Sequence, residues 1–94
     1  MLLVRGVNVY PSSIEAILRR FPQIDEFRII VRRAGALDEI ELEVECSETL
    51  VLEVEAALRQ ALTLRVPIHA VQQGSLPRFE LKARRVLDRR GEEN

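Results

Sequence analysis

The chain has 94 residues, 47% of them hydrophobic, and a formal net charge of −1, which is typical of one small folded domain spanning residues 1–94. The balanced charge and the 4% aromatic content favour neither a nucleic-acid nor a membrane partner, and no apolar run reaches the ~18 residues that a membrane-spanning helix needs. Cys46 is the only cysteine, which excludes an internal disulfide and indicates a cytoplasmic protein.

The amino-terminal end is predicted to form a short strand, a loop and a helix. The apolar Leu2–Val4 is the strand, and the stretch "RGVNVYP", broken by Gly6 and Pro11, predicts an extended loop. The helix is expected to begin at Ser12, because "SSIE" matches a capping box. Apolar residues then recur at helical spacing, at Ile14, Ile17, Leu18 and Phe21.

Two strands that form a hairpin are expected next, in Phe27–Val31 and in the stretch "EIELEVEC" at residues 39–46. Perfect alternation in the second strand predicts one apolar face and one solvated face, the latter carrying Glu39, Glu41, Glu43 and Glu45. Arg28 and Arg32 are expected to pair with these glutamates across the strands. We interpret this row of four glutamates as a solvated face and not as a cation site, because neighbouring carboxylates in it lie ~7 Å apart along the strand.

The second half is predicted to contain a helix, a strand and a further helix. Ser47 is a plausible N-cap for a helix from Glu48 to about Leu64, and "PIHAVQ" reads as the third main strand. Residues from about Leu81 to Arg90 are expected to be helical, with their arginines facing solvent. The order predicts an α+β fold: a small β-α-β-β-α-β sandwich, with two helices packed on one face of a three- to four-stranded sheet and a short C-terminal helix.

Residues with catalytic potential are few. His69 and Cys46 have neither metal-ligand nor triad spacing, so we expect no metal site and assign both to the strand structure. Function is therefore expected in two loops, one around Arg5 and one around Lys82. Lys82 is the only lysine beside 13 arginines. Its ammonium group is a compact charge on a flexible stem, so it can approach a phosphate oxygen and a carboxylate oxygen at the same time.

Together, the stretches "RGVNVYPSSIE" and "GSLPRFELKARRV" resemble the C-terminal domain of phenylacetate–CoA ligases, members of the adenylate-forming superfamily. The resemblance covers essentially the whole chain and implies a two-step reaction. A carboxylate attacks the α-phosphate of ATP, which is bound with Mg²⁺, to give an acyl-adenylate and pyrophosphate. The thiol of CoA then displaces AMP. Leu81 departs from the superfamily pattern, which commonly has glycine before the lysine.

The resemblance also implies roles for individual residues. Lys82 matches the lysine that acts in adenylation, and the loop with Arg5, Gly6, Val7 and Asn8 matches the one that lines the CoA passage. Arg78, in the second loop, is a further candidate for cofactor binding.

A mobile lid domain of this type works against a large N-terminal domain, which holds the nucleotide and the aryl carboxylate. The resemblance implies that this N-terminal domain and the hinge are absent from residues 1–94, so we do not expect the isolated chain to be active. The partner would be an N-terminal domain in the same chain or in a separate one. Formation of a homodimer is left as an alternative.

Two other hypotheses remain. A β-α-β-β-α-β order is also the plan of ferredoxin-like modules that bind small molecules and regulate without catalysis, although this rests on fold alone. The third hypothesis is an interaction domain without a ligand, whose sign would be an exposed apolar patch away from both loops.

Overall fold

The computed structural model describes residues 2–77 and 85–92, which form an α+β fold with a mixed sheet. In chain order the elements are β1 (Leu2–Val4), β2 (Val7–Val9), α1 (Pro11–Leu18), β3 (Phe27–Ala34), β4 (Leu37–Glu45), α2 (Glu48–Leu62), β5 (Ile68–Val71), β6 (Val86–Asp88) and the 3-10 helix η2 (Arg90–Glu92). The predicted fold class is confirmed, but the described sheet has six strands and not three or four.

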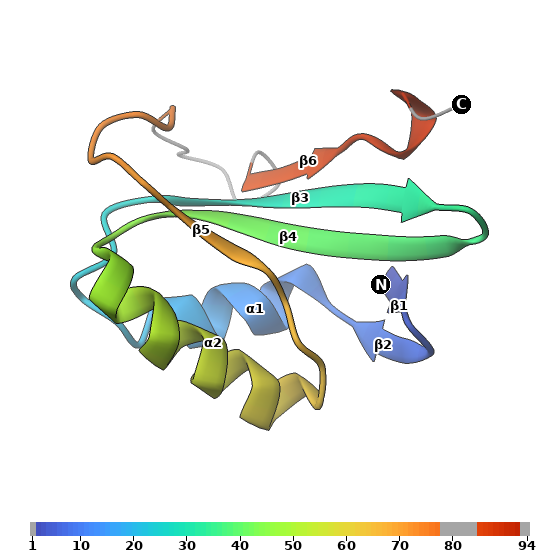
Figure 1. Ribbon diagram of the computed structural model, residues 1–94, viewed down its shortest axis with the longest axis horizontal. Coiled ribbons are helices and arrows are strands. Elements are labelled where there is room, and N and C mark those ends of the chain that lie inside the picture. Colours follow the sequence, from blue (N-terminus) through green and yellow to red (C-terminus); the bar gives the residue numbers. More distant parts are fainter. Residues whose placement is uncertain (1, 78–84, 93–94) are drawn as a thin grey trace.

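The sheet is built on the long antiparallel hairpin of β3 and β4, whose register runs from Phe27 opposite Val44 to Ala34 opposite Leu37. One edge of the hairpin, along β4, pairs with two strands: β1 joins near the start of β4, at Asp38, and β5 joins in parallel near its end. The opposite edge, along β3, pairs in parallel with β6. Strands β1, β5 and β6 are therefore attached directly to this hairpin, and β2 is joined to it through β1 (Figure 1).

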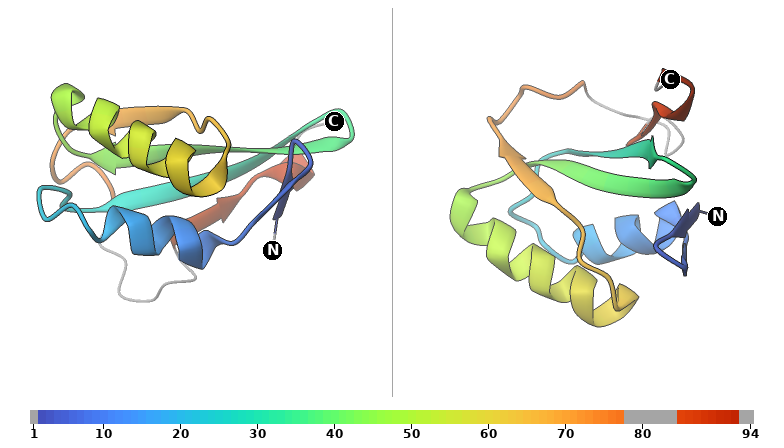
Figure 2. Two further views of the ribbon diagram at one scale, coloured as in Figure 1. Left: turned by 90° about the horizontal axis from the view of Figure 1, so that it is seen from below. Right: turned by 45° about the vertical axis from the view of Figure 1, so that its right-hand side comes forward.

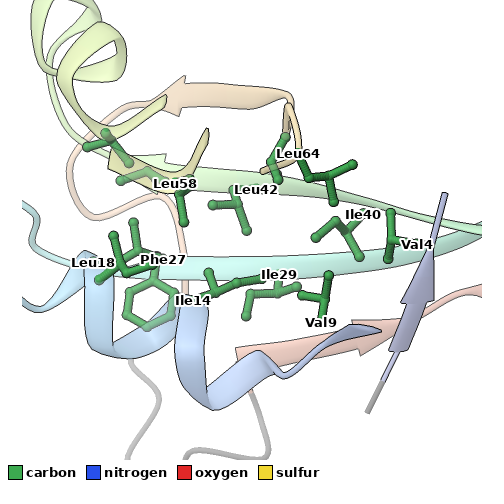
Figure 3. Packing of buried hydrophobic residues seen from close by; sticks show 14 of the residues in the cluster. Val4, Val9, Ile14, Leu18, Phe27, Ile29, Ile40, Leu42, Leu58 and Leu64 are labelled. Carbon is green, nitrogen blue, oxygen red and sulfur yellow. The ribbon is translucent and has the colours of Figure 1, made fainter. Parts of the chain in front are cut away.

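Both helices cover the same face of the sheet (Figures 1 and 2), as the sequence predicted. Alternation puts the apolar residues of β3 and β4 on this face, where directly opposite residues such as Ile29 and Leu42 pack as pairs. Figure 3 shows Ile14 of α1 and Leu58 of α2 reaching toward them from the helices. Each of these four side chains is at most 1% exposed, so the core is one continuous layer between sheet and helices.

The opposite face of the hairpin carries the ion pairs that the sequence predicted. The Nε of Arg28 donates to Glu43 at 2.8 Å, and the Nε of Arg32 donates to Glu41 at 2.7 Å. His69 of β5 also contacts Glu41, at 3.1 Å. These pairs are partly exposed to solvent, so each adds less than about 1 kcal/mol to stability.

The start of α1 differs from the prediction. The helix begins at Pro11, its N-cap is Tyr10, and the side chain of Tyr10 makes no capping hydrogen bond, so the expected capping box at Ser12 is wrong. Proline suits the first helical turn because the amide hydrogen that it lacks would have no partner there. In α2, by contrast, the predicted N-cap is confirmed: the Oγ of Ser47 accepts from the amide of Leu50 at 3.2 Å.

The predicted C-terminal helix is also wrong for the part of it that the structure describes. Residues 86–88 form the strand β6, followed by a short 3-10 helix, where a helix had been expected as far as Arg90. The free edge of β3 explains the difference, because β6 completes backbone hydrogen bonds that the edge would otherwise leave open. Val86 at the same time packs against the core.

The pairs around Glu41 predict a pH dependence of stability. The hydrogen bond from Arg32 is the largest cause that lowers the pKa of Glu41 below its ordinary value of 4.5, and His69 adds to it. A lowered pKa stabilises the fold above pH 4.5, and this contribution is lost as the pH falls through the folded-state pKa.

We therefore expect Glu41→Gln to reduce the free energy of unfolding at pH 7. The difference from the parent should shrink as the pH falls from about 5 to about 3, the range in which carboxylates titrate. Urea unfolding curves across that range would measure it, with Glu39→Gln as the control from the same strand. A difference that is constant over the whole range would contradict the assignment.

Candidate functional site

The first predicted loop is a tight β-hairpin and not an extended loop. Pairing of Val4 with Val7 leaves Arg5 and Gly6 as a two-residue turn, with φ of 50° and 81°. Positive φ at both positions defines a type I′ turn, where asparagine or glycine is normally preferred at the first position. Arg5 is therefore held in a conformation that is unfavourable for its side chain.

The turn presents a positive charge to solvent. The side chain of Arg5 is about half exposed, and its guanidinium lies 3.9 Å from Glu39, which is a loose contact. Nothing within 4 Å would meet a Cβ on Gly6, so its positive φ is what requires glycine there. Asn8 is exposed, whereas Val7 is half-buried against the core. Three of the four predicted residues, Arg5, Gly6 and Asn8, are thus accessible together.

The second predicted loop is described only at its two ends. Lys82 and Arg78 lie outside the described residues, so their assigned roles stay predictions. The described chain reaches Pro77 after β5 and continues at Arg85 before β6. Both ends lie at the open end of the β3–β4 hairpin, where β3 begins and β4 finishes (Figure 1).

Glu45 fixes the first of these ends. Its carboxylate accepts two backbone hydrogen bonds, from Gly74 to Oε1 and from Leu76 to Oε2, both at 2.9 Å. Glu45 is 1% exposed and Leu76 is also buried. The prediction that all four glutamates of β4 face solvent is therefore wrong at Glu45, because the chain after β5 folds over it and supplies donors for both oxygens.

Arg85 fixes the second end. Its Nε donates to Oε1 of Glu26 at 2.7 Å and its Nη2 lies 3.4 Å from Oε2, a two-pronged contact in which both side chains are largely buried. Its Nη1 is 3.8 Å from Glu15 of α1, and its guanidinium lies 5.1 Å from the ring centre of Phe27. The prediction that Arg85 belongs to a solvated helix face is therefore wrong.

Glu26 and Glu45 are neighbours across the two strands. Extending the register of Phe27 and Val44 by one pair puts them opposite each other, and the amide of Glu45 donates to the carbonyl of Glu26 at 2.8 Å. Two like charges directly opposite each other destabilise a sheet. Here separate donors compensate the two carboxylates: backbone amides for Glu45, and Arg85 with the amide of Phe27 for Glu26.

Sequence reasoning missed Glu26, Glu45 and Arg85 as a group. Glu45 continues the alternation of a solvated row, and Arg85 lies in an arginine-rich run, so local pattern predicts exposure for both. A usable signal was the position of Glu26 and Glu45 at matching ends of the predicted hairpin strands. Two acids facing each other there require compensating donors from another part of the chain.

The first loop and the two described ends of the second loop lie at opposite ends of the hairpin. The Arg5–Gly6 turn follows β1, which pairs with β4 at Asp38, while the ends of the second loop lie at Glu45. At 3.4 Å per residue, these two positions on β4 are about 24 Å apart. Figure 1 shows the β1–β2 hairpin at the end of the sheet opposite to the chain that leaves β5.

Other chemistry is sparse among residues 2–77 and 85–92. No cluster of three potential metal-ligating side chains occurs there, and no helix is long and apolar enough to cross a membrane. Cys46 is half-buried beside the core, and burial raises the pKa of its thiol, with Glu48 adding to the effect. The thiol is thus disfavoured as a nucleophile.

Comparison with protein families gives a match over nearly the whole chain. The family described as the AMP-binding enzyme C-terminal domain matches residues 6–90. The phenylacetate–coenzyme A ligase of Thermus thermophilus is 51% identical over 55 residues, which cover 57% of this chain and 12% of that protein. The chain spans between 12% and 24% of the length of the curated relatives that it matches.

Solved structures show the same similarity. A domain of phenylacetate–coenzyme A ligase from Bacteroides vulgatus is 30% identical, with a TM-score of 0.77 over 96% of this chain and 92% of that chain. 2-Hydroxyisobutyryl-CoA ligase, bound to 2-HIB-AMP and CoA in its thioesterification state, is 35% identical, with a TM-score of 0.77 over 90% of this chain and 20% of that chain. Its postadenylation state with 2-HIB-AMP gives a TM-score of 0.79 over 95% of this chain and 21% of that chain.

The buried position of Arg85 predicts a large stability effect. We expect Arg85→Met to lower the free energy of unfolding by about 3 kcal/mol, because it removes the two-pronged, largely buried ion pair with Glu26. Arg33→Met, which alters a half-exposed pair with Asp38, should cost less than about 1 kcal/mol. Urea unfolding at pH 7 would compare the two, and equal losses would contradict the structural role of Arg85.

Proposed function

Because the chain belongs to the family of AMP-binding enzyme C-terminal domains, in the branch found in phenylacetate–CoA ligases, we propose that it acts as the mobile C-terminal domain of an acid–CoA ligase of this type. The overall reaction converts ATP, an aryl carboxylate and CoA into the acyl-CoA thioester, AMP and pyrophosphate. The observation that carries the proposal is that the Arg5–Gly6 turn and the two described ends of the second loop lie at opposite ends of one hairpin.

In the first half-reaction, a carboxylate oxygen attacks the α-phosphorus of ATP, and pyrophosphate leaves. Negative charge builds on the α-phosphoryl oxygens in the transition state. A correctly placed ammonium group stabilises that charge and orients the carboxylate. We assign this electrostatic role to Lys82, with Arg78 as a second cation near the phosphates.

In the second half-reaction, the thiol of CoA attacks the acyl carbon of the adenylate, the thiol proton is released and AMP leaves. We assign the approach of CoA to the β1–β2 turn, with Arg5 contacting a phosphate of CoA and the accessible Gly6 and Asn8 flanking the pantetheine arm. The left-handed conformation of Arg5 supports this role, because a side chain kept at a strained position suggests a use beyond stability.

The separation of the loops supports an alternation between two poses. The Arg5–Gly6 turn and the described ends of the Lys82 segment meet β4 at positions about 24 Å apart, so we expect the two loops to serve a reaction centre in turn and not together. Rotation of the domain against its partner would present the Lys82 end first and the Arg5 end second. For 2-hydroxyisobutyryl-CoA ligase, structures in postadenylation and thioesterification states exist, and this chain superposes on both.

The nucleotide and the acid are assigned to an N-terminal partner domain. Mg²⁺ would accompany ATP and be held by the ATP phosphates and the partner domain, because no metal-ligating cluster occurs in the part of this chain that the structure describes.

The role of Lys82 can be tested by half-reaction. We would join this chain to the N-terminal part of the Thermus thermophilus ligase, in place of its own matching segment. Lys82→Ala should lower the rate of adenylate formation by at least about 100-fold, as loss of one transition-state charge contact does. Attack of CoA on preformed phenylacetyl-adenylate should change less than about threefold. Equal losses in both steps would exclude the assigned role.

If the parent fusion is well folded and inactive, the ligase assignment fails. The ferredoxin-like binding module then becomes the better hypothesis, and it would be recognised by a stable homodimer that binds a small metabolite.

The role of Arg5 predicts the opposite kinetic result, with an effect on the CoA step and none on adenylate formation. Arg5→Gly should raise the KM for CoA about tenfold, because it removes one charge-assisted contact, and should leave adenylate formation unchanged. Relief of the left-handed strain and the extra chain entropy of glycine offset each other, so stability should stay within about 0.5 kcal/mol. Steady-state kinetics of the same fusion would measure this, with Arg33→Gly as the control. An unchanged KM for CoA would refute the contact.

A further inference from the structure

We propose that Glu45 and Glu26 are positioning residues that hold the two ends of the segment carrying Lys82. The proposal rests on the adenylation role assigned to that lysine and concerns the two described ends of its segment. Glu45 binds the backbone before the segment, and Glu26 binds Arg85 after it. The two carboxylates are opposite neighbours on β4 and at the start of β3, so both ends are fixed to one rigid point of the sheet.

The contact at Glu45 is built for holding backbone. Each of its two oxygens accepts from a different amide, at Gly74 and at Leu76, so the carboxylate spans a short turn of chain. Gly74 has a φ of 83°, a conformation that few other residues adopt, and the turn therefore depends on glycine there. With Glu45 1% exposed, water does not compete for these bonds.

The contact at Glu26 restrains the other end through a side chain. Glu26 meets Arg85 in a two-pronged geometry, which fixes the orientation of the guanidinium as well as its distance. Phe27 and Glu15 contact the same guanidinium from the strand and from α1. Residue 85 is therefore fixed both by these contacts and by β6, which begins at the next residue.

Fixing both ends matters for a catalytic lysine. Its flexible stem gives the ammonium a wide range, and a transition-state contact is effective only when the backbone limits that range before the substrate arrives. Residues 77–84 connect the two fixed ends. Release of either end increases the conformational freedom of the connection and lowers the fraction of molecules with Lys82 in a productive place.

The single lysine provides a direct probe. Endoproteinase Lys-C cuts after lysine, and Lys82 is the only lysine in the chain, so native-state cleavage of the 94-residue protein reports on this segment alone. We expect Glu45→Gln and Glu26→Gln to raise the cleavage rate at least about tenfold, since each removes a charge-assisted hydrogen bond. Both substitutions keep the size of the side chain.

Glu43→Gln is the matched control. It lies two residues from Glu45 on the same strand, loses its pair with Arg28 on the open face, and should leave the rate within about twofold of the parent. Urea unfolding gives the free energy of global unfolding of each variant, and the cleavage rates are corrected for the part that arises from global unfolding. Corrected rates of the two positioning variants that equal those of the control would overturn the proposal.

A second arm tests the consequence for catalysis in the fusion with the Thermus thermophilus N-terminal part. Glu45→Gln should lower kcat for adenylate formation about tenfold and leave the KM for CoA unchanged, because it acts through Lys82. In Lys82→Ala the same substitution should have no further effect. Loss of both half-reactions to the same extent would indicate a structural role and overturn the positioning role.

The two arms separate the proposals. If Lys82→Ala leaves adenylation intact, the assigned function of the lysine fails, while Lys-C cleavage still decides whether Glu45 and Glu26 hold the segment. If cleavage is unchanged and Lys82→Ala abolishes adenylation, the positioning proposal fails alone.

Discussion

The register of the β3–β4 hairpin is the constraint on which the rest of the molecule depends. It pairs apolar residues such as Ile29 and Leu42 on one face and ionic residues such as Arg28 and Glu43 on the other. Helices α1 and α2 pack on the first face, and β1, β5 and β6 attach to the two edges. A shift of one residue would exchange the two faces and remove the surface on which both helices pack.

Local patterns in the sequence predicted the elements whose environment is set by their own residues. Alternation identified the hairpin, and Ser47 identified the start of α2. Predictions were wrong where another part of the chain decides the outcome. The open edge of β3 made residues 86–88 a strand, although the arginine-rich run around them favours a surface helix. At the start of α1 the deciding signal was local, because Pro11 suits the first helical turn.

The same division applies to the functional residues. Glu43 and Glu45 are two residues apart in one alternating strand, but Glu43 faces a solvated arginine and Glu45 is enclosed by the chain after β5. Nothing in their immediate neighbours distinguishes them, because burial of Glu45 depends on a segment far along the sequence. The Arg5–Gly6 turn differs, since its glycine indicates a turn locally although the arginine conceals the turn type.

The short outer strands β2 and β6 have a consequence for how the protein behaves among other copies of itself. Within residues 2–77 and 85–92, the two long strands β3 and β4 each have neighbours on both sides, and the outer strands β2, β5 and β6 have only three or four residues each. Unpaired backbone on a long, flat edge is a template for association into aggregates. A sheet whose ladder ends in such short strands offers little template for pairing with the strands of another copy.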